Sequence, residues 1–145
     1  ARTVYGGGGI MPDFFVPIDT TQYTDYHRNI VAKGVVIKTT MKFIESHRKE
    51  LQSKYKKFET FNDKFEISDE ILANMQTLAE QEKIKFDEKQ YRKSLPLIKT
   101  QLKALIARDL WDMNEYFQIM NTTDSSVLQA LKVLNEGAYE KVVRL

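Results

Sequence analysis

The feature that most constrains the fold is a run of apolar residues at helical spacing in the second half of the chain. Successive members are four, three, four and three residues apart: Tyr91, Leu95, Ile98, Leu102 and Leu105. This spacing places the five side chains on one face of an α-helix, which buries that face against neighbouring elements. We therefore expect a central helix here, continuing toward Leu110 and Trp111.

A proline lies inside this pattern. Pro96 has no backbone N–H and removes one intrahelical hydrogen bond. The helix is therefore either kinked at Pro96 or restarted there, with Pro96 in its first turn. The apolar stripe continues unbroken across the proline, which favours the kink.

Two further helices are expected before residue 60. The first runs from Tyr23 to Lys33, with Thr24 as its N-cap and Gly34 just past its end. The second has an apolar stripe that consists of Ile37, Met41, Ile44, Leu51 and Tyr55. One face of this second helix should be buried.

The segment from Lys57 to Ile67 is expected to be a non-helical loop. Its three aromatic residues should hold it against the core: Phe58, Phe61 and Phe65. Ser68 is then a suitable N-cap for a helix that ends near Lys83. The apolar stripe of that helix consists of Ile71, Met75 and Leu78.

Two short helices should complete the chain. One covers Asn114 to Met120, and the other is capped by Asp124 or Ser125 and ended by Gly137. The residues of the last helix expected to point inward are Val127, Leu131 and Leu134. The predicted fold is mainly α, a bundle-like domain of five to six helices with an extended, glycine-rich N-terminal arm.

The distribution of glycine and proline divides the chain into two parts. Residues 1–22 carry all but two of the glycines, two of the three prolines and a β-type apolar pattern. Residues 23–145 have the helical patterns described above. We therefore expect a boundary near residue 22, between an arm and a helical domain.

Composition excludes several classes of protein. Hydrophobic residues make up 42% and charged residues 29% of the 145-residue chain, with a net charge of +2, as in a soluble globular domain. Without cysteine, the chain has no disulfide, no thiolate nucleophile and no cysteine-based zinc site. No apolar run is long enough for a membrane span, and no nucleic-acid-binding motif is present.

Basic residues are in local excess between residues 23 and 60. They include Lys49, Lys54, Lys56 and Lys57. An anionic partner is one interpretation, and the solvated face of a helix is the one favoured, because no aromatic stacking platform accompanies them.

The residues contain no recognisable catalytic or metal-binding arrangement. His27 and His47 are twenty positions apart and lack the spacing of metal ligands, so each is expected at a surface or a helix end. Paired acidic residues such as Asp69 and Glu70 are explained by the dipole at a helix start. We predict no catalytic residue, no metal and no cofactor.

Four consecutive glycines, Gly6 to Gly9, suggest a phosphate-binding loop at first sight. A G-x-G-x-x-G pattern that starts at Gly6 places Met11 where the third glycine is required. Pro12 also biases Met11 away from the helical region, so no helix N-terminus follows the glycines. A nucleotide site is therefore not expected.

The string from Arg2 to Asp13 resembles the segment that closes the protease core in carboxyl-terminal processing, or tail-specific, serine peptidases. Its last five residues match the family's G-I-x-P-D pattern. The residues that carry the resemblance are Arg2, Gly6, Gly9, Ile10, Pro12 and Asp13. Ala1 departs from the pattern, because the family usually has glycine there. Residues 103–108, followed by Trp111, look more weakly like the C-terminal extension of one bacterial branch.

The resemblance implies a parent hydrolase of the periplasm or cell envelope that cleaves polypeptides near their C-termini. Such enzymes use a serine nucleophile and a lysine base. The family's nucleophile, base and PDZ domain precede the string, and no serine or lysine of this chain matches the catalytic motif. The chain alone is therefore expected to be inactive as a protease, with the parent core and its substrates as partners.

Two functions for the helical part follow. As a regulatory, structural or oligomerisation appendage, it should leave apolar surface bare when isolated. As an independent module that recruits a substrate or adaptor, it should be well covered, with a concave patch flanked by Lys49 to Lys57. A free-standing enzyme built from His27 and His47 is the least favoured interpretation.

Overall fold

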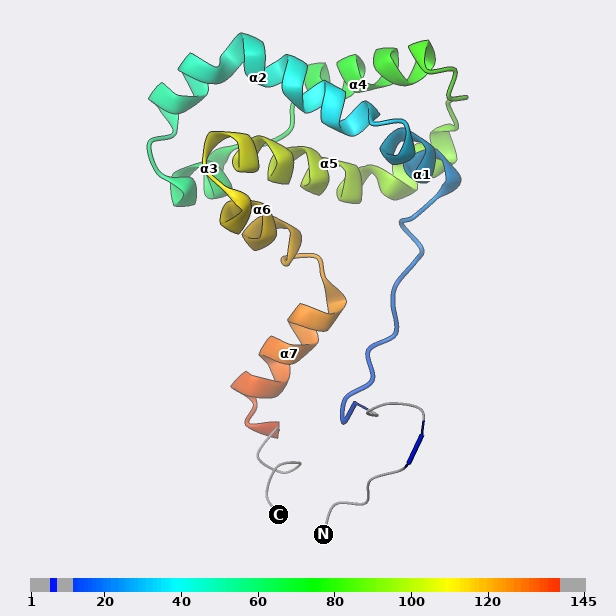
Figure 1. Cartoon of the computed structure of the whole chain (residues 1–145), viewed down its shortest axis with the longest axis vertical. Helices are drawn as coiled ribbons and strands as arrows, with labels where there is room; N and C mark the ends of the chain where they lie inside the picture. Colours follow the sequence, from blue (N-terminus) through cyan, green and yellow to red (C-terminus); the bar gives the residue numbers. More distant parts are fainter. Residues whose placement is uncertain (1–5, 8–11, 139–145) are drawn as a thin grey trace. The chain divides into compact units, whose positions relative to one another are not determined.

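The computed structural model describes residues 6–7 and 12–138. These residues form α-helices and no strand, so the predicted mainly α fold is confirmed. The helices are α1 (Asp25–Ala32), α2 (Val35–Lys54), α3 (Phe58–Lys64), α4 (Asp69–Gln81), α5 (Glu88–Leu110), α6 (Met113–Met120) and α7 (Ser125–Asn135) (Figure 1). Thr20–Thr123, with α1 to α6, is one compact unit, and α7 belongs to a second unit with the described residues before Thr20.

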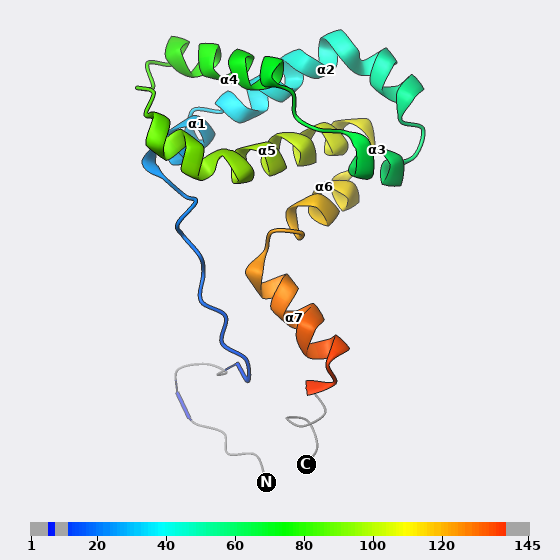
Figure 2. The same cartoon turned by 180° about the vertical axis from the view of Figure 1, so that it is seen from behind.

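Helix α5 is the centre of the first unit. It contacts α1, α2 and α6, and two opposite views place α2 and α4 on one side of it and α6 on the other (Figures 1 and 2). Four consecutive residues of α5, from Ala104 to Ala107, are buried. Consecutive burial means that the helix is covered all round at this point, and the two alanines allow its neighbours to approach closely.

Helix α5 runs without a break from its N-cap, Asp87, through Pro96. The alternative of a helix restarted at Pro96 is therefore wrong. Pro96 is exposed, so the carbonyl that loses its hydrogen-bond partner lies on the side of the helix nearest to water, where the loss costs least.

Helix α3 was not predicted, because its segment was expected to be a non-helical loop. Its phenylalanines are three and four residues apart, which is helical spacing, and all three are buried: Phe58, Phe61 and Phe65. The Phe61 and Phe65 rings stack with centroids 4.6 Å apart, and the Trp111 ring lies 5.3 Å from that of Phe61. The segment thus contributes an aromatic cluster to the core, as expected, but as a helix.

The buried face of α2 differs from the prediction in its first half. Met41 is 59% exposed and Ile37 is also exposed, whereas Thr39 and Thr40 are buried. The Thr39 hydroxyl donates to the Val35 carbonyl at 2.8 Å, and the Thr40 hydroxyl donates to the Ile37 carbonyl. Because their own helix accepts these hydrogen bonds, the two threonines can be buried without unpaired polar atoms.

The predicted helix ends are confirmed at several positions. The side chains of Thr24, Ser68 and Asp124 accept hydrogen bonds from backbone N–H groups in the first turns of α1, α4 and α7. Between α1 and α2, Gly34 has φ +69°, a left-handed conformation that glycine adopts without steric cost. Gly34 therefore permits the tight turn that brings α2 beside α1.

We expect Phe61→Ala to lower the free energy of unfolding by about 3–5 kcal/mol, because Phe61 is fully buried among aromatic rings. Met41→Ala, in the exposed part of α2, should change it by less than about 0.5 kcal/mol. Urea unfolding followed by circular dichroism measures both. Equal destabilisation by the two variants would contradict this account of the core.

Tyr26 has a buried hydroxyl with no hydrogen-bond partner among the described residues. Burial raises its pKa to about 12, and the charges of Tyr91 and Glu80 act in the same direction. Above about pH 10 the unfolded chain releases this proton while the folded chain keeps it, so the tyrosine destabilises the fold as pH rises to about 12.

Tyr26→Phe should therefore be neutral or stabilising at pH 7, and should reduce the loss of stability between pH 10 and 12. Urea unfolding at a series of pH values measures this change. The control is Tyr23→Phe, since Tyr23 is largely exposed. An unchanged alkaline profile in the Tyr26 variant would be the contrary result.

Candidate functional site

The residues that carry the family resemblance all belong to the N-terminal arm. Gly6, Pro12 and Asp13 are described and exposed. Arg2, Gly9 and Ile10 lie outside the described residues, as do the residues before Gly6, where the β-type apolar pattern begins. The segment from Phe15 to Thr20 has no regular secondary structure.

The two histidines do not form a site. His27 lies in the first turn of α1, so the helix-end alternative holds for it, whereas the surface alternative does not. His27 is only 3% exposed, and its Nε2 lies 2.9 Å from the side-chain oxygen of Gln101 on α5. His47 lies on α2, where its ring stacks on Phe43 and its Nδ1 is 3.0 Å from the Phe43 carbonyl oxygen. Nowhere in the described part of the chain do three or more potential metal ligands cluster.

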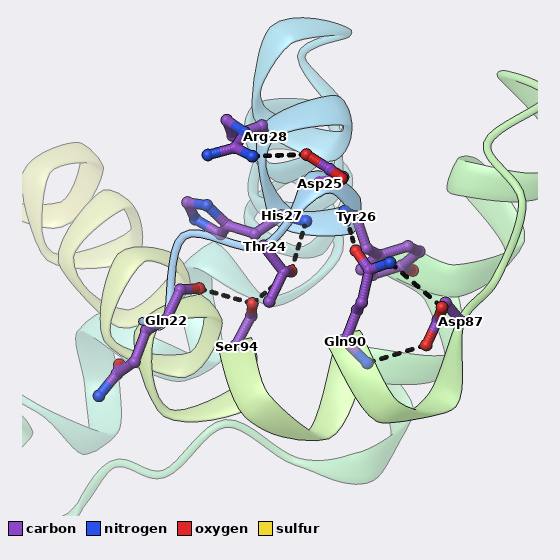
Figure 3. A network of polar contacts seen from close by, with 9 residues as sticks. All are labelled: Gln22, Thr24, Asp25, Tyr26, His27, Arg28, Asp87, Gln90 and Ser94. Atoms are coloured by element: carbon purple, nitrogen blue, oxygen red, sulfur yellow. Dashed lines mark hydrogen bonds and ion pairs between the residues drawn. The ribbon is translucent and has the colours of Figure 1, made fainter. Parts of the chain in front are cut away.

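A network of polar contacts, the polar junction, connects the start of α1 to the first half of α5 (Figure 3). At its centre is Ser94, which is fully buried. Its hydroxyl donates to the Gln22 carbonyl at 2.6 Å and lies 2.7 Å from the Thr24 hydroxyl. Because Ser94 has one proton to donate, the Thr24 hydroxyl must be the donor to Ser94.

The Thr24 oxygen also accepts a hydrogen bond from the His27 backbone N–H, which makes it the N-cap of α1. A second connection lies beside this one, where the Gln90 side-chain oxygen accepts from the Tyr26 backbone N–H at 2.8 Å. Asp87 orients Gln90 by accepting from its backbone and side-chain N–H groups. Side chains of α5 thus satisfy backbone groups at the start of α1.

The polar junction therefore fixes where the chain enters the helical unit. Its groups are buried or half-buried and paired with one another, which suits a structural connection better than a reaction centre. The sequence analysis identified Thr24 as a cap but did not identify its partner, since Ser94 is seventy positions away. One signal was present: Ser94 precedes Ile98 by one helical turn, on a face that is buried.

Helix α7 presents an apolar face that none of the described residues covers. Leu131 and Leu134 were expected to point inward with Val127, but no residue of α7 is buried, and Leu134 is 58% exposed. Its exposed leucines are Leu128, Leu131 and Leu134. Three- and four-residue spacing predicts an apolar stripe correctly, but it does not show that the chain itself supplies the opposite surface.

Smaller apolar pairs are exposed on the other unit. Ile37 and Met41 are one turn apart on α2, and Met113 and Phe117 are one turn apart on α6. In the described residues, no helix combines the length and apolar character needed to cross a membrane. Lys49 and Lys54 are exposed on α2, as expected for a solvated helix face, whereas Lys56 and Lys57 are exposed in the connection between α2 and α3.

These observations define a helical domain with a buried polar junction and uncovered apolar faces. Residues 26–112 match a family of unknown function, DUF8443, and this match covers more than half of the chain. The chain belongs to this family. The match runs from the second residue of α1 to the residue before α6. Comparisons with curated proteins and with solved structures find no match.

We expect Ser94→Ala to lower the free energy of unfolding by about 1–3 kcal/mol, because it leaves the Gln22 carbonyl and the Thr24 hydroxyl without their buried partner. Ser46→Ala is the matched control, since Ser46 is exposed on α2. Urea unfolding measures both, and a double-mutant cycle with Thr24→Ala should be non-additive. Additive effects would show that the two hydroxyls do not act together.

Proposed function

We propose that this chain contains the C-terminal helical domain of a carboxyl-terminal processing serine endopeptidase. In this proposal the domain is not catalytic, and it acts as a regulatory, structural or oligomerisation appendage. The observation that carries the proposal is the uncovered apolar stripe of α7. Bare apolar surface is what the appendage hypothesis expects of a domain separated from the surface on which it packs.

Covering the exposed leucines of α7 would contribute to the free energy of binding a partner surface. Fully burying one leucine side chain contributes about 1.5–3 kcal/mol. Leu128, Leu131 and Leu134 are each about half exposed, so covering the three contributes on the order of 3 kcal/mol. Met113 and Phe117 on α6 present further apolar surface that a partner can cover.

The order of elements along the chain also supports the proposal. The motif that resembles the end of a protease core finishes at Asp13, and the polar junction holds the chain at Gln22. A short segment therefore separates the motif from the start of the helical unit. An appendage joined to a protease core in this way stays close to it, because a short linker produces a high effective concentration.

The resemblance implies different roles for the parent core and the helical domain. The parent core supplies the serine nucleophile and the lysine base and acts on polypeptides in the periplasm or cell envelope, while the helical domain controls access, assembly or stability. The surfaces on which α7 packs are then the parent core or a second copy of the domain.

One observation favours the alternative, a module that recruits a substrate or adaptor. A hollow of about 220 Å³ lies beside the basic residues, and its lining includes Tyr55, Lys56 and Trp111. A concave patch flanked by Lys49 to Lys57 is what this alternative expects. The hollow is small for a docking groove, so the bare apolar face of α7 outweighs it.

Three preparations test the proposal: the parent peptidase, the parent truncated after Asp19, and the truncated parent with the present chain added in trans. The measurement is cleavage of an unstructured polypeptide. We expect truncation to alter the rate and the added chain to restore it. If the truncated enzyme cleaves generic substrates as the intact one does, the appendage hypothesis fails.

A pair of variants tests whether α7 is needed for the added chain to restore the cleavage rate of the truncated parent, which we call restoration. Leu131→Gln should abolish it, because the substitution places a polar group in the centre of the apolar stripe. Lys132→Gln changes the neighbouring exposed residue and should restore activity as the unchanged chain does. Circular dichroism checks that both variants are folded. Restoration by the Leu131 variant would exclude α7 as the docking surface.

A further inference from the structure

A second hollow, distinct from the polar junction and from α7, lies on the unit formed by Thr20–Thr123. Its volume is about 390 Å³, within the range of small-molecule sites in proteins. It is bordered by the end of α3 and the segment after it, by one face of α5, and by the end of α6. All three elements belong to the same compact unit.

The lining of the hollow is apolar at several positions. Phe65, Ile67 and Ile119 line it, and each is itself buried in the core. These side chains are held in place by core packing, so they form a fixed surface. A ligand that fits here must have an apolar body to cover them.

A half-buried ammonium group provides the main polar contact. Lys103 on α5 donates from Nζ to the Asn62 carbonyl at 2.6 Å, and Nζ lies 5.9 Å from the centre of the Phe61 ring. Burial lowers the pKa of Lys103, whereas the charges of Glu66 and Asp63 raise it. A lysine ammonium has three donors, and the Asn62 carbonyl uses one.

Two further charged side chains, a lysine and a glutamate, determine which ligand charge the hollow favours. Lys99 lies one helical turn before Lys103 and lines the same hollow, as does Glu66. Among the residues that line the hollow, these two lysines and one carboxylate leave a single positive charge to neutralise, and the Asp63 carboxylate, which acts on Lys103 from outside the lining, opposes any further negative charge. A monoanion matches this balance, whereas a dianion such as phosphate is disfavoured by the Glu66 carboxylate.

Two hydroxyl groups supply acceptors. Thr100 donates to the Pro96 carbonyl at 3.0 Å, and Thr122 donates to the Ile119 carbonyl at 2.7 Å. Because each hydroxyl has used its proton, its oxygen faces a ligand only as an acceptor. The hollow thus combines hydrogen-bond donors from the lysines and hydrogen-bond acceptors from the threonines with an apolar surface.

We propose that this hollow is a binding site for a monocarboxylate with an apolar body, whose carboxylate is held by Lys103 and Lys99. The inference does not rest on the proposed function. The same chemistry is available from a free organic acid or from an acylated amino acid such as a peptide end. The threonine oxygens distinguish the two, because only the acylated amino acid has an N–H to donate to them.

The experiment is an NMR titration of the full chain with isocaproate, with its neutral analogue isocaproamide and with N-acetyl-leucine. Backbone signals of residues that line the hollow should shift with isocaproate and remain unchanged with isocaproamide. Tighter binding of N-acetyl-leucine than of isocaproate would identify the acylated form as the better ligand. Equal shifts with the acid and the amide, or none with either acid, would overturn the proposal.

Lys103→Met keeps an apolar stem and removes the charge, so it should weaken binding roughly tenfold to a hundredfold. Lys93→Met is the matched control, because Lys93 is exposed on the same helix and does not line the hollow. If the Lys103 variant fails to fold, Lys99→Met provides the test at the second lysine of the hollow. Unchanged affinity in the folded variants would reject the two lysines as the carboxylate site.

Discussion

The fold depends on covering α5 from all sides. A helix whose residues 104–107 are all buried cannot exist in water alone, and each neighbour gains stability from the apolar surface that it removes from solvent. Helices α2 and α6 supply most of the cover, and α1 closes the end nearest to the polar junction. The aromatic cluster around Phe61 and Trp111 does the same at the other end. Most of the contacts between helices of this unit therefore involve α5, while α4 packs on α2.

The sequence predicted the elements that local chemistry determines. Thr24, Ser68 and Gly34 were identified at helix ends, because a cap or a left-handed turn leaves a signal within a few residues. Helix α3 was missed, since it is short and its aromatic residues were interpreted as anchors of a loop. The burial of Thr39 and Thr40 was missed for another reason. A threonine that bonds to its own helix is effectively an apolar residue, and its side-chain type conceals this.

The candidate sites were less predictable than the fold. His27 and Ser94 are buried because residues about seventy positions away bring them partners, and no local pattern reports such a pairing. The apolar stripe of α7 is the opposite case. Its periodicity is evident in the sequence, but no surface in the described part of the chain packs against it. The hollow around Lys103 unites residues from three elements that the sequence keeps far apart. Their shared position depends on the packing of α3, α5 and α6.

The polar junction has a consequence for how the protein folds during synthesis. The hydroxyl that fixes the start of α1 belongs to Ser94, seventy residues downstream of Thr24. At translation rates of 5–20 residues per second, the ribosome takes roughly 4 to 14 seconds to add that many residues. Throughout that time α1 lacks both its polar partners and the apolar surface of α5, and a helix of eight residues is unstable without them. The nascent chain therefore exposes Tyr26 and Ile30, which are buried in the folded protein, until α5 has emerged.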